Sequence, residues 1–220
     1  MRHRMRMKWI IGVLFASVCV TTCSGQYQIL KGKTDPGDME DCFPKTPARI
    51  CLGAAGTTHC YAPPSDKDYI FGLEPKAMPV GQLDGHELTL FTAMFSGCGS
   101  GTLTHYSLLT VRNGEFINLL PKVELTNVSE FKLWNLTQFS SLPVLITADF
   151  IWNMDAGESH FDRHRYKISV YVYDPKSHFY TERIHFNTEK NYSGGDSNPI
   201  NALELERPTI LAKLQQEGLN

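Results

Sequence analysis

The chain has 220 residues, of which 42% are hydrophobic, 20% charged and 11% aromatic, and its net charge is −2. This length suffices for one domain with a substantial core or for two small ones, and the ordinary glycine and proline contents exclude collagen-like and low-complexity chains. The first 25 residues hold four Lys or Arg and no acid, so the remainder is more acidic still, which argues against nucleic-acid binding.

Residues 1–25 have the pattern of a signal peptide. A basic head precedes the mostly apolar run 9–20, which is too short for a membrane span of about 20 residues. The small polar residues that follow suit cleavage near Gly25. Cys23 is a lipidation candidate, because Val20-Thr21-Thr22-Cys23 resembles a bacterial lipoprotein signal. Either route predicts an exported protein that is periplasmic, on the cell surface or secreted.

Residues 26–80 are predicted to form an irregular segment rich in cysteine and proline. Its central part has little apolar periodicity, so crosslinks of about 2–4 kcal/mol each would be needed to tie it to the domain. An oxidising compartment favours disulfides, and four cysteines allow two bonds in three connectivities. A structural zinc site is disfavoured because no CxxC pair occurs. The disulfide candidates are Cys42, Cys51, Cys60 and Cys98.

Residues 81–220 are predicted to form a β-rich domain. In 86–95, Leu88 and Leu90 alternate with Phe91 and Ala93, so both faces of this strand should be covered. Asn113-Gly114 between two β-prone runs predicts a type I′ hairpin. Alternation in the later runs places Tyr180, Ile184 and Phe186 on one face of a single strand. The other predicted strands are 106–112, 115–120, 144–152, 165–173 and 178–186.

The pattern at the C-terminal end of the chain predicts a helix. A helix over 208–216 begins with a proline in its first turn and carries one apolar stripe, Ile210, Leu211 and Leu214. We expect it to cap one open end of the sheet. The fold class is therefore all-β, a mainly antiparallel meander in a sandwich or barrel-like arrangement, with a C-terminal helix and a disulfide-tied, proline-rich N-terminal segment.

One stretch carries a candidate metal site. If the chain is extended there, alternation brings Glu158, His160, Asp162 and His164 onto one face, with alternate positions about 6.6 Å apart. Imidazole and carboxylate suit a divalent metal such as zinc, iron, manganese or copper. The competing interpretation is a polar loop, in which the histidines bond to turn backbone and Asp162 caps a turn. Asp149, which interrupts an apolar strand, is expected to pair with a cation across the hairpin.

A second candidate is a contact surface at an aromatic-rich hairpin tip, formed by Tyr171, Tyr173, Phe179 and Tyr180. The alternative is that this tip packs under the C-terminal helix. The sequence favours a non-catalytic exported domain that binds a protein, glycan or envelope component. Such a domain needs no cofactor, and it would touch the membrane only through a lipid anchor. The alternative is a metal-binding protein or metal-dependent hydrolase that uses the row from Glu158 to His164.

Overall fold

The computed structural model describes residues 27–34, 43–53, 59–66, 68–96, 101–152, 159, 162–193 and 201–218. The predicted signal peptide with Cys23 lies outside these residues, as do Cys42, Cys98, Glu158 and His160.

The predicted fold class is confirmed: the chain is mainly antiparallel β-sheet with a helical C-terminus and a disulfide in its N-terminal region. The two helices are α1 (Ala202–Leu205) and α2 (Arg207–Gln216). The strands are β1 (Tyr27–Leu30), β2 (Arg49–Leu52), β3 (Cys60–Tyr61), β4 (Leu73–Leu83), β5 (His86–Ser96), β6 (Thr102–Arg112), β7 (Glu115–Asn118), β8 (Val123–Thr126), β9 (Glu130–Trp134), β10 (Val144–Phe150), β11 (Arg163–His164), β12 (Tyr166–Asp174), β13 (Phe179–Asn187) and β14 (Tyr192–Ser193).

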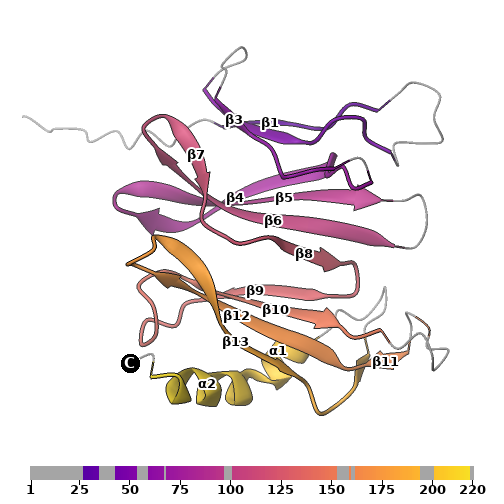
Figure 1. Cartoon of the computed structure of the whole chain (residues 1–220), viewed down its shortest axis with the longest axis vertical. Helices are drawn as coiled ribbons and strands as arrows, with labels where there is room; N and C mark the ends of the chain where they lie inside the picture. The colour runs from indigo at the N-terminus through magenta and orange to yellow at the C-terminus, as the bar shows by residue number, and fades with distance from the viewer. Residues whose placement is uncertain are drawn as a thin grey trace, which may run out of the picture.

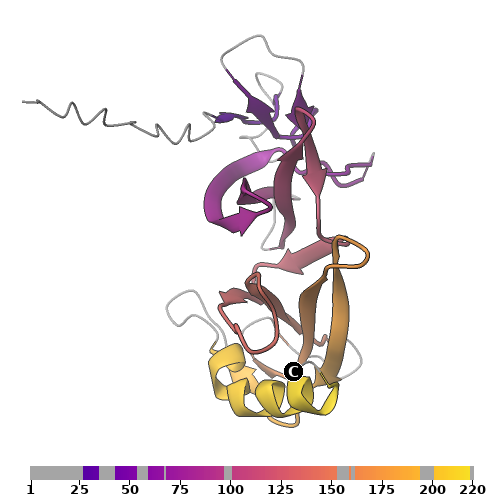
Figure 2. The ribbon, with the colours of Figure 1, turned by 90° about the vertical axis from the view of Figure 1, so that its left-hand side faces the viewer.

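These elements form a stack of four layers along the long axis of the molecule (Figures 1 and 2). The small sheet β1-β2-β3 lies at one end, followed by a five-stranded sheet in which β6 pairs with β5 on one edge and with β7 and β8 on the other. The sheet β13-β12-β10-β9 comes next, and α1 and α2 cover its far face. Apolar side chains fill each space between layers, so the buried core is divided into three clusters.

The five-stranded sheet is apolar on both faces, as the alternation in β5 predicts. Leu88 and Leu90 face the four-stranded sheet, whereas Phe91 and Ala93 face the N-terminal layer. The Asn113-Gly114 hairpin is also confirmed, since both residues have positive φ, 52° and 79°.

β4 was not predicted, because two prolines and a glycine interrupt its pattern. It is the edge strand of its sheet, where proline is tolerated, and its pairing with β5 shifts register at two places. The turn after it, Asp84-Gly85, repeats the positive φ values of the other hairpin and is the sequence signal that could have revealed this strand.

The helical layer covers the face of the four-stranded sheet; it does not cap an open end of the sheet. The predicted apolar stripe packs against this face of the sheet, with Ile210 and Leu214 fully buried and Leu211 at the margin. One strand-face prediction is wrong: Tyr180 lies in the cluster opposite to that of Ile184. The β12–β13 pairing shifts register here, because Val170 is opposite Ile184 while Tyr171 is opposite Glu182. β13 thus has one extra residue between Glu182 and Ile184, and the side chains before and after it point to opposite faces.

The segment predicted to be irregular contains β1, β2, β3 and most of β4, so a boundary at residue 80 falls within a strand. Cys51 and Cys60 form a disulfide between β2 and β3. Two glycines allow close backbone packing in this layer. A Cβ atom on Gly32 would lie 2.1 Å from the Thr46 carbonyl oxygen, and one on Gly72 would lie 2.7 Å from the same atom.

Candidate binding groove

Two residues of the predicted metal site, Asp162 and His164, lie in the described part of the chain and hold a loop together. The Asp162 carboxylate accepts a hydrogen bond from the Ser159 backbone N–H at 2.6 Å, and the His164 ring nitrogen Nε2 lies 2.8 Å from the Ser159 carbonyl. His164 is buried and stacks on Trp152. No group of three His, Cys, Asp or Glu among the described residues is placed to hold a metal ion. Because Glu158 and His160 lie outside those residues, the metal site stays a prediction.

Asp149 is opposite Lys167 in the β10–β12 pairing, and this lysine is one of the cations expected to pair with it. Its carboxylate accepts a hydrogen bond from the Ser129 hydroxyl at 2.5 Å. Burial raises the pKa of Asp149, while the Ser129 bond and the charge of Lys167 oppose that shift. These contacts join the turn between β8 and β9 to the four-stranded sheet.

The aromatic hairpin tip has two kinds of residue. Tyr173 and Tyr180 are buried between the two large sheets, and the Tyr180 hydroxyl donates to the Pro143 carbonyl at 2.9 Å. Tyr171 is half-buried against the same cluster, and Phe179 is exposed. The tip thus packs against the five-stranded sheet and not under the helix. A contact surface here stays a prediction that rests on Phe179 and the rim of Tyr171.

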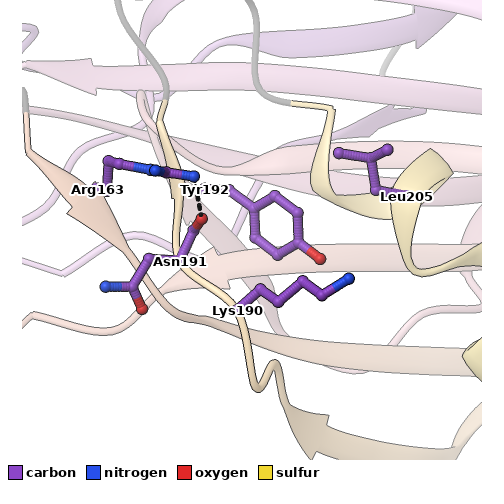
Figure 3. A pocket seen from close by; sticks show the side chains of 5 residues that line it. All are labelled: Arg163, Lys190, Asn191, Tyr192 and Leu205. Carbon is purple, nitrogen blue, oxygen red and sulfur yellow. Dashed lines mark hydrogen bonds between the residues drawn. The ribbon is translucent and has the colours of Figure 1, made fainter.

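A hollow lies beside the turn between β13 and β14. It has a volume of about 490 Å³ and is lined by Arg163, Lys190, Asn191, Tyr192 and Leu205 (Figure 3). A second hollow of about 380 Å³ shares Lys190 and Leu205 with the first and continues along α2. We call the two together the Lys190 groove. The remaining residues of the second hollow are Phe186, Asn187, Glu189, Glu206, Thr209 and Lys213.

The wall that carries Lys190 is fixed by Thr188, which is buried. The Thr188 hydroxyl donates to the Lys190 carbonyl at 2.8 Å and accepts from the Tyr166 N–H at 3.0 Å. Arg165 donates to the Thr188 carbonyl at 2.6 Å. Because each of these hydrogen bonds involves a main-chain atom, the backbone of the turn has a defined conformation and holds its side chains in place.

The floor of the first hollow is Tyr192, whose hydroxyl donates to the Glu206 carboxylate at 2.5 Å. Burial, followed by the contact with Glu206, raises the pKa of Tyr192 to about 12. The tyrosine therefore stays protonated and links β14 to the junction of the two helices. In Figure 3 the Tyr192 ring lies between the side chains of Arg163 and Leu205, with Lys190 running below it.

The opposite wall is α1, which is held by its contact with β9. Glu130 accepts a hydrogen bond from the Leu203 N–H at 2.9 Å, and Lys132 bridges Glu130 and Glu204 at 2.9 and 3.1 Å. Ala202 and Leu203 are fully buried, so α1 cannot rotate without exposing them. Leu205 consequently stands in solvent at a fixed position.

Three cations, Arg163, Lys190 and Lys213, and two carboxylates, Glu189 and Glu206, line the groove. The Glu206 carboxylate accepts the hydrogen bond of Tyr192, and the cations outnumber the carboxylates. Arg163 donates to the Asn191 carbonyl at 3.1 Å (Figure 3). The Lys213 ammonium lies over the Phe186 ring, 5.1 Å from the ring centroid. Among the described residues, none of the three cations is in an ion pair with a carboxylate. Elsewhere in the chain, ion pairs are formed by Lys76, Arg112, Lys122, Lys132, Arg183 and Arg207.

These guanidinium and ammonium groups, beside an exposed leucine, equip the groove to bind a carboxylate, sulfate or phosphate group that is attached to an apolar moiety. Sequence reasoning missed this groove. Its residues come from β11, the β13–β14 turn and the helices, and no periodicity or motif connects those segments.

Comparison of the chain with protein-family models, with curated proteins and with solved structures found no match in any of the three. Within the described residues, neither helix has the length and apolar character that crossing a membrane requires.

Proposed function

We propose that this protein is an exported, non-catalytic domain that binds an anionic partner of the cell envelope or extracellular space in the Lys190 groove. The observation that carries the proposal is the convergence of Arg163, Lys190 and Lys213, without carboxylate partners among the described residues, on one concave surface. Their charges are available to a ligand, because no carboxylate in the described part of the chain has to be displaced first.

Two further features support binding over chemistry. The Tyr192 hydroxyl is committed to Glu206 and stays protonated, so it stabilises the floor of the groove and does not act as a base. The turn between β13 and β14 and the helix α1 are held by hydrogen bonds to their main-chain atoms, so the cations lie on a preformed surface. The signal-like pattern of residues 1–25 supports export to the compartment where such a partner would be met.

The test measures binding of two acidic polymers, poly-L-glutamate and polygalacturonate, to the purified mature protein at low ionic strength. Replacing both Arg163→Ala and Lys190→Ala should weaken binding of at least one polymer by about tenfold or more, because charge-assisted hydrogen bonds are lost. Salt should weaken binding by the wild type more than binding by this variant.

The matched control is Arg49→Ala with Lys33→Ala. It removes one arginine and one lysine, both exposed, from the N-terminal layer and so changes the net charge equally. We expect the control to bind like the wild type. Equal loss in the two variants would attribute binding to overall charge and would reject the groove, as would the absence of binding to either polymer.

A further inference from the structure

Leu205 is unusual among the apolar side chains of this protein. The residue is 62% exposed, the highest value for a large hydrophobic residue in the part of the chain that the structure describes. This exposure does not come from a loose chain end. The Leu205 N–H bonds to the Asn201 carbonyl at 3.2 Å, and the next residue, Glu206, is buried. The fold therefore holds a leucine rigidly in water.

Leu205 also occupies the centre of the groove, because it lines both hollows. Arg163 lies in the first hollow only and Lys213 in the second only, while Lys190 belongs to both. Cations thus lie on either side of one apolar contact point. A complementary ligand carries an apolar group with negative charges on both sides of it.

The apolar part of the groove is aliphatic. Tyr192 is only 9% exposed, and Phe186 is half-buried with the Lys213 ammonium 5.1 Å from its ring centroid. Both rings are therefore less accessible than the Leu205 side chain. An aliphatic side chain gains free energy by burying area against another apolar side chain of any shape, and a sugar ring, which is covered with hydroxyl groups, has less apolar area to bury. The groove therefore suits a polypeptide better than an anionic glycan.

We infer that the partner in the Lys190 groove is an acidic polypeptide segment whose aliphatic side chain packs on Leu205 while carboxylates on both sides meet Arg163, Lys190 and Lys213. This inference rests on the proposed function and names the chemical class of its partner. Leu205 supplies the apolar contact, and the cations set the position of the segment along the groove.

The experiment uses two blocked synthetic peptides and one glycan. In the first peptide a leucine is flanked on each side by two aspartates, and in the second a serine replaces that leucine. The glycan is an oligogalacturonate of similar charge. Binding of each is measured by calorimetry with the wild type, with Leu205→Ser and with Met78→Ser, which removes another exposed aliphatic side chain, on β4.

We expect the wild type to bind the leucine peptide about tenfold more tightly than the serine peptide, which corresponds to the burial of one leucine side chain. Leu205→Ser should abolish this preference for leucine over serine, while Met78→Ser should behave like the wild type. Unchanged thermal melting of Leu205→Ser shows that the loss is not one of folding.

Two other outcomes overturn the inference in different ways. If the glycan binds more tightly than both peptides and Leu205→Ser has no effect, the partner is not a polypeptide, but the groove remains an anion site. If none of the three probes binds, the proposed function fails as well.

Discussion

The two ends of the layered stack are held by different forces. In the described residues, fifteen buried side chains join the helical layer to the four-stranded sheet, whereas six join the N-terminal sheet to the five-stranded one. The N-terminal end adds the Cys51–Cys60 bond and glycine-mediated backbone contacts such as the Gly32 N–H to the Gly72 carbonyl at 2.8 Å. The helical end thus depends on apolar burial, and the N-terminal end on crosslinking and close backbone fit.

This difference shows how one chain can stabilise a layer that has little apolar surface. A disulfide reduces the entropy of the unfolded chain, so it adds stability without any apolar area. Loss of apolar packing should therefore act on the helical end of the stack, and loss of the disulfide on the N-terminal end.

The largest effect is expected at the helical end. Ile210→Ala removes a fully buried side chain between α2 and the sheet and should lower the free energy of unfolding by about 2–5 kcal/mol. Urea unfolding followed by tryptophan fluorescence measures this change. Thr209→Ala, exposed on the same helix, is the control and should change the free energy by less than about 0.5 kcal/mol. A loss below about 1 kcal/mol for Ile210→Ala would mean that apolar burial does not hold this layer.

The crosslink should matter next. Replacing Cys51→Ala and Cys60→Ala opens a loop with a sequence separation of 9, for which chain entropy predicts a loss of about 2.5 kcal/mol at most. Hydrogen exchange locates the effect: amides of β1 and β2 should exchange faster, while those of β10 and β12 keep their protection. Equal acceleration in all four strands would show that the N-terminal layer is not a separable unit.

His105 on β6 should make the stability of the fold depend on pH. His105 is buried beside Phe71, its Nδ1 lies 3.4 Å from a Glu124 carboxylate oxygen, and its Nε2 has no hydrogen-bond partner among the described residues. Burial lowers the pKa of His105 below 6.5, Lys122 acts in the same direction, and Glu124 opposes it.

Because the unfolded chain binds this proton at a higher pH than the folded one, stability should fall as the pH drops below 6.5. Urea unfolding above and below that value measures the fall, which should be smaller in His105→Gln. An identical pH dependence in the variant would assign the effect to other groups.

The sequence predicts those parts of the fold where the local pattern and the turn chemistry agree. β10 and β12 alternate regularly and bury the predicted faces, and Asn113-Gly114 forms the predicted hairpin. Prediction fails where tertiary context decides. β4 tolerates its prolines only because it lies at an edge, and the register shift after Val170 reverses the side of Tyr180 although the sequence there still alternates.

The candidate site was harder to predict than the fold. The sequence drew attention to Asp162 and His164, which are close in the chain, and the structure uses both to hold Ser159. The Lys190 groove instead joins β11 to a turn and a helix far along the chain. Leu205 illustrates the limit, because nothing in its local sequence distinguishes it from Leu203, which is fully buried two residues earlier.

The smallest effect on stability is expected in the groove itself. Arg163 and Lys190 are exposed and have no carboxylate partner among the described residues, so replacing both with alanine should change the free energy of unfolding by less than about 0.5 kcal/mol. The backbone of their segments is held by Thr188 and by the β11–β14 pairing, which do not involve the removed charges. The same double variant is expected to lose binding of acidic polymers. Folding would then depend on the main-chain bonds of these segments, and ligand binding on their charged side chains. A loss of more than about 1 kcal/mol in urea unfolding would instead make the two cations part of what holds the helical end of the stack together.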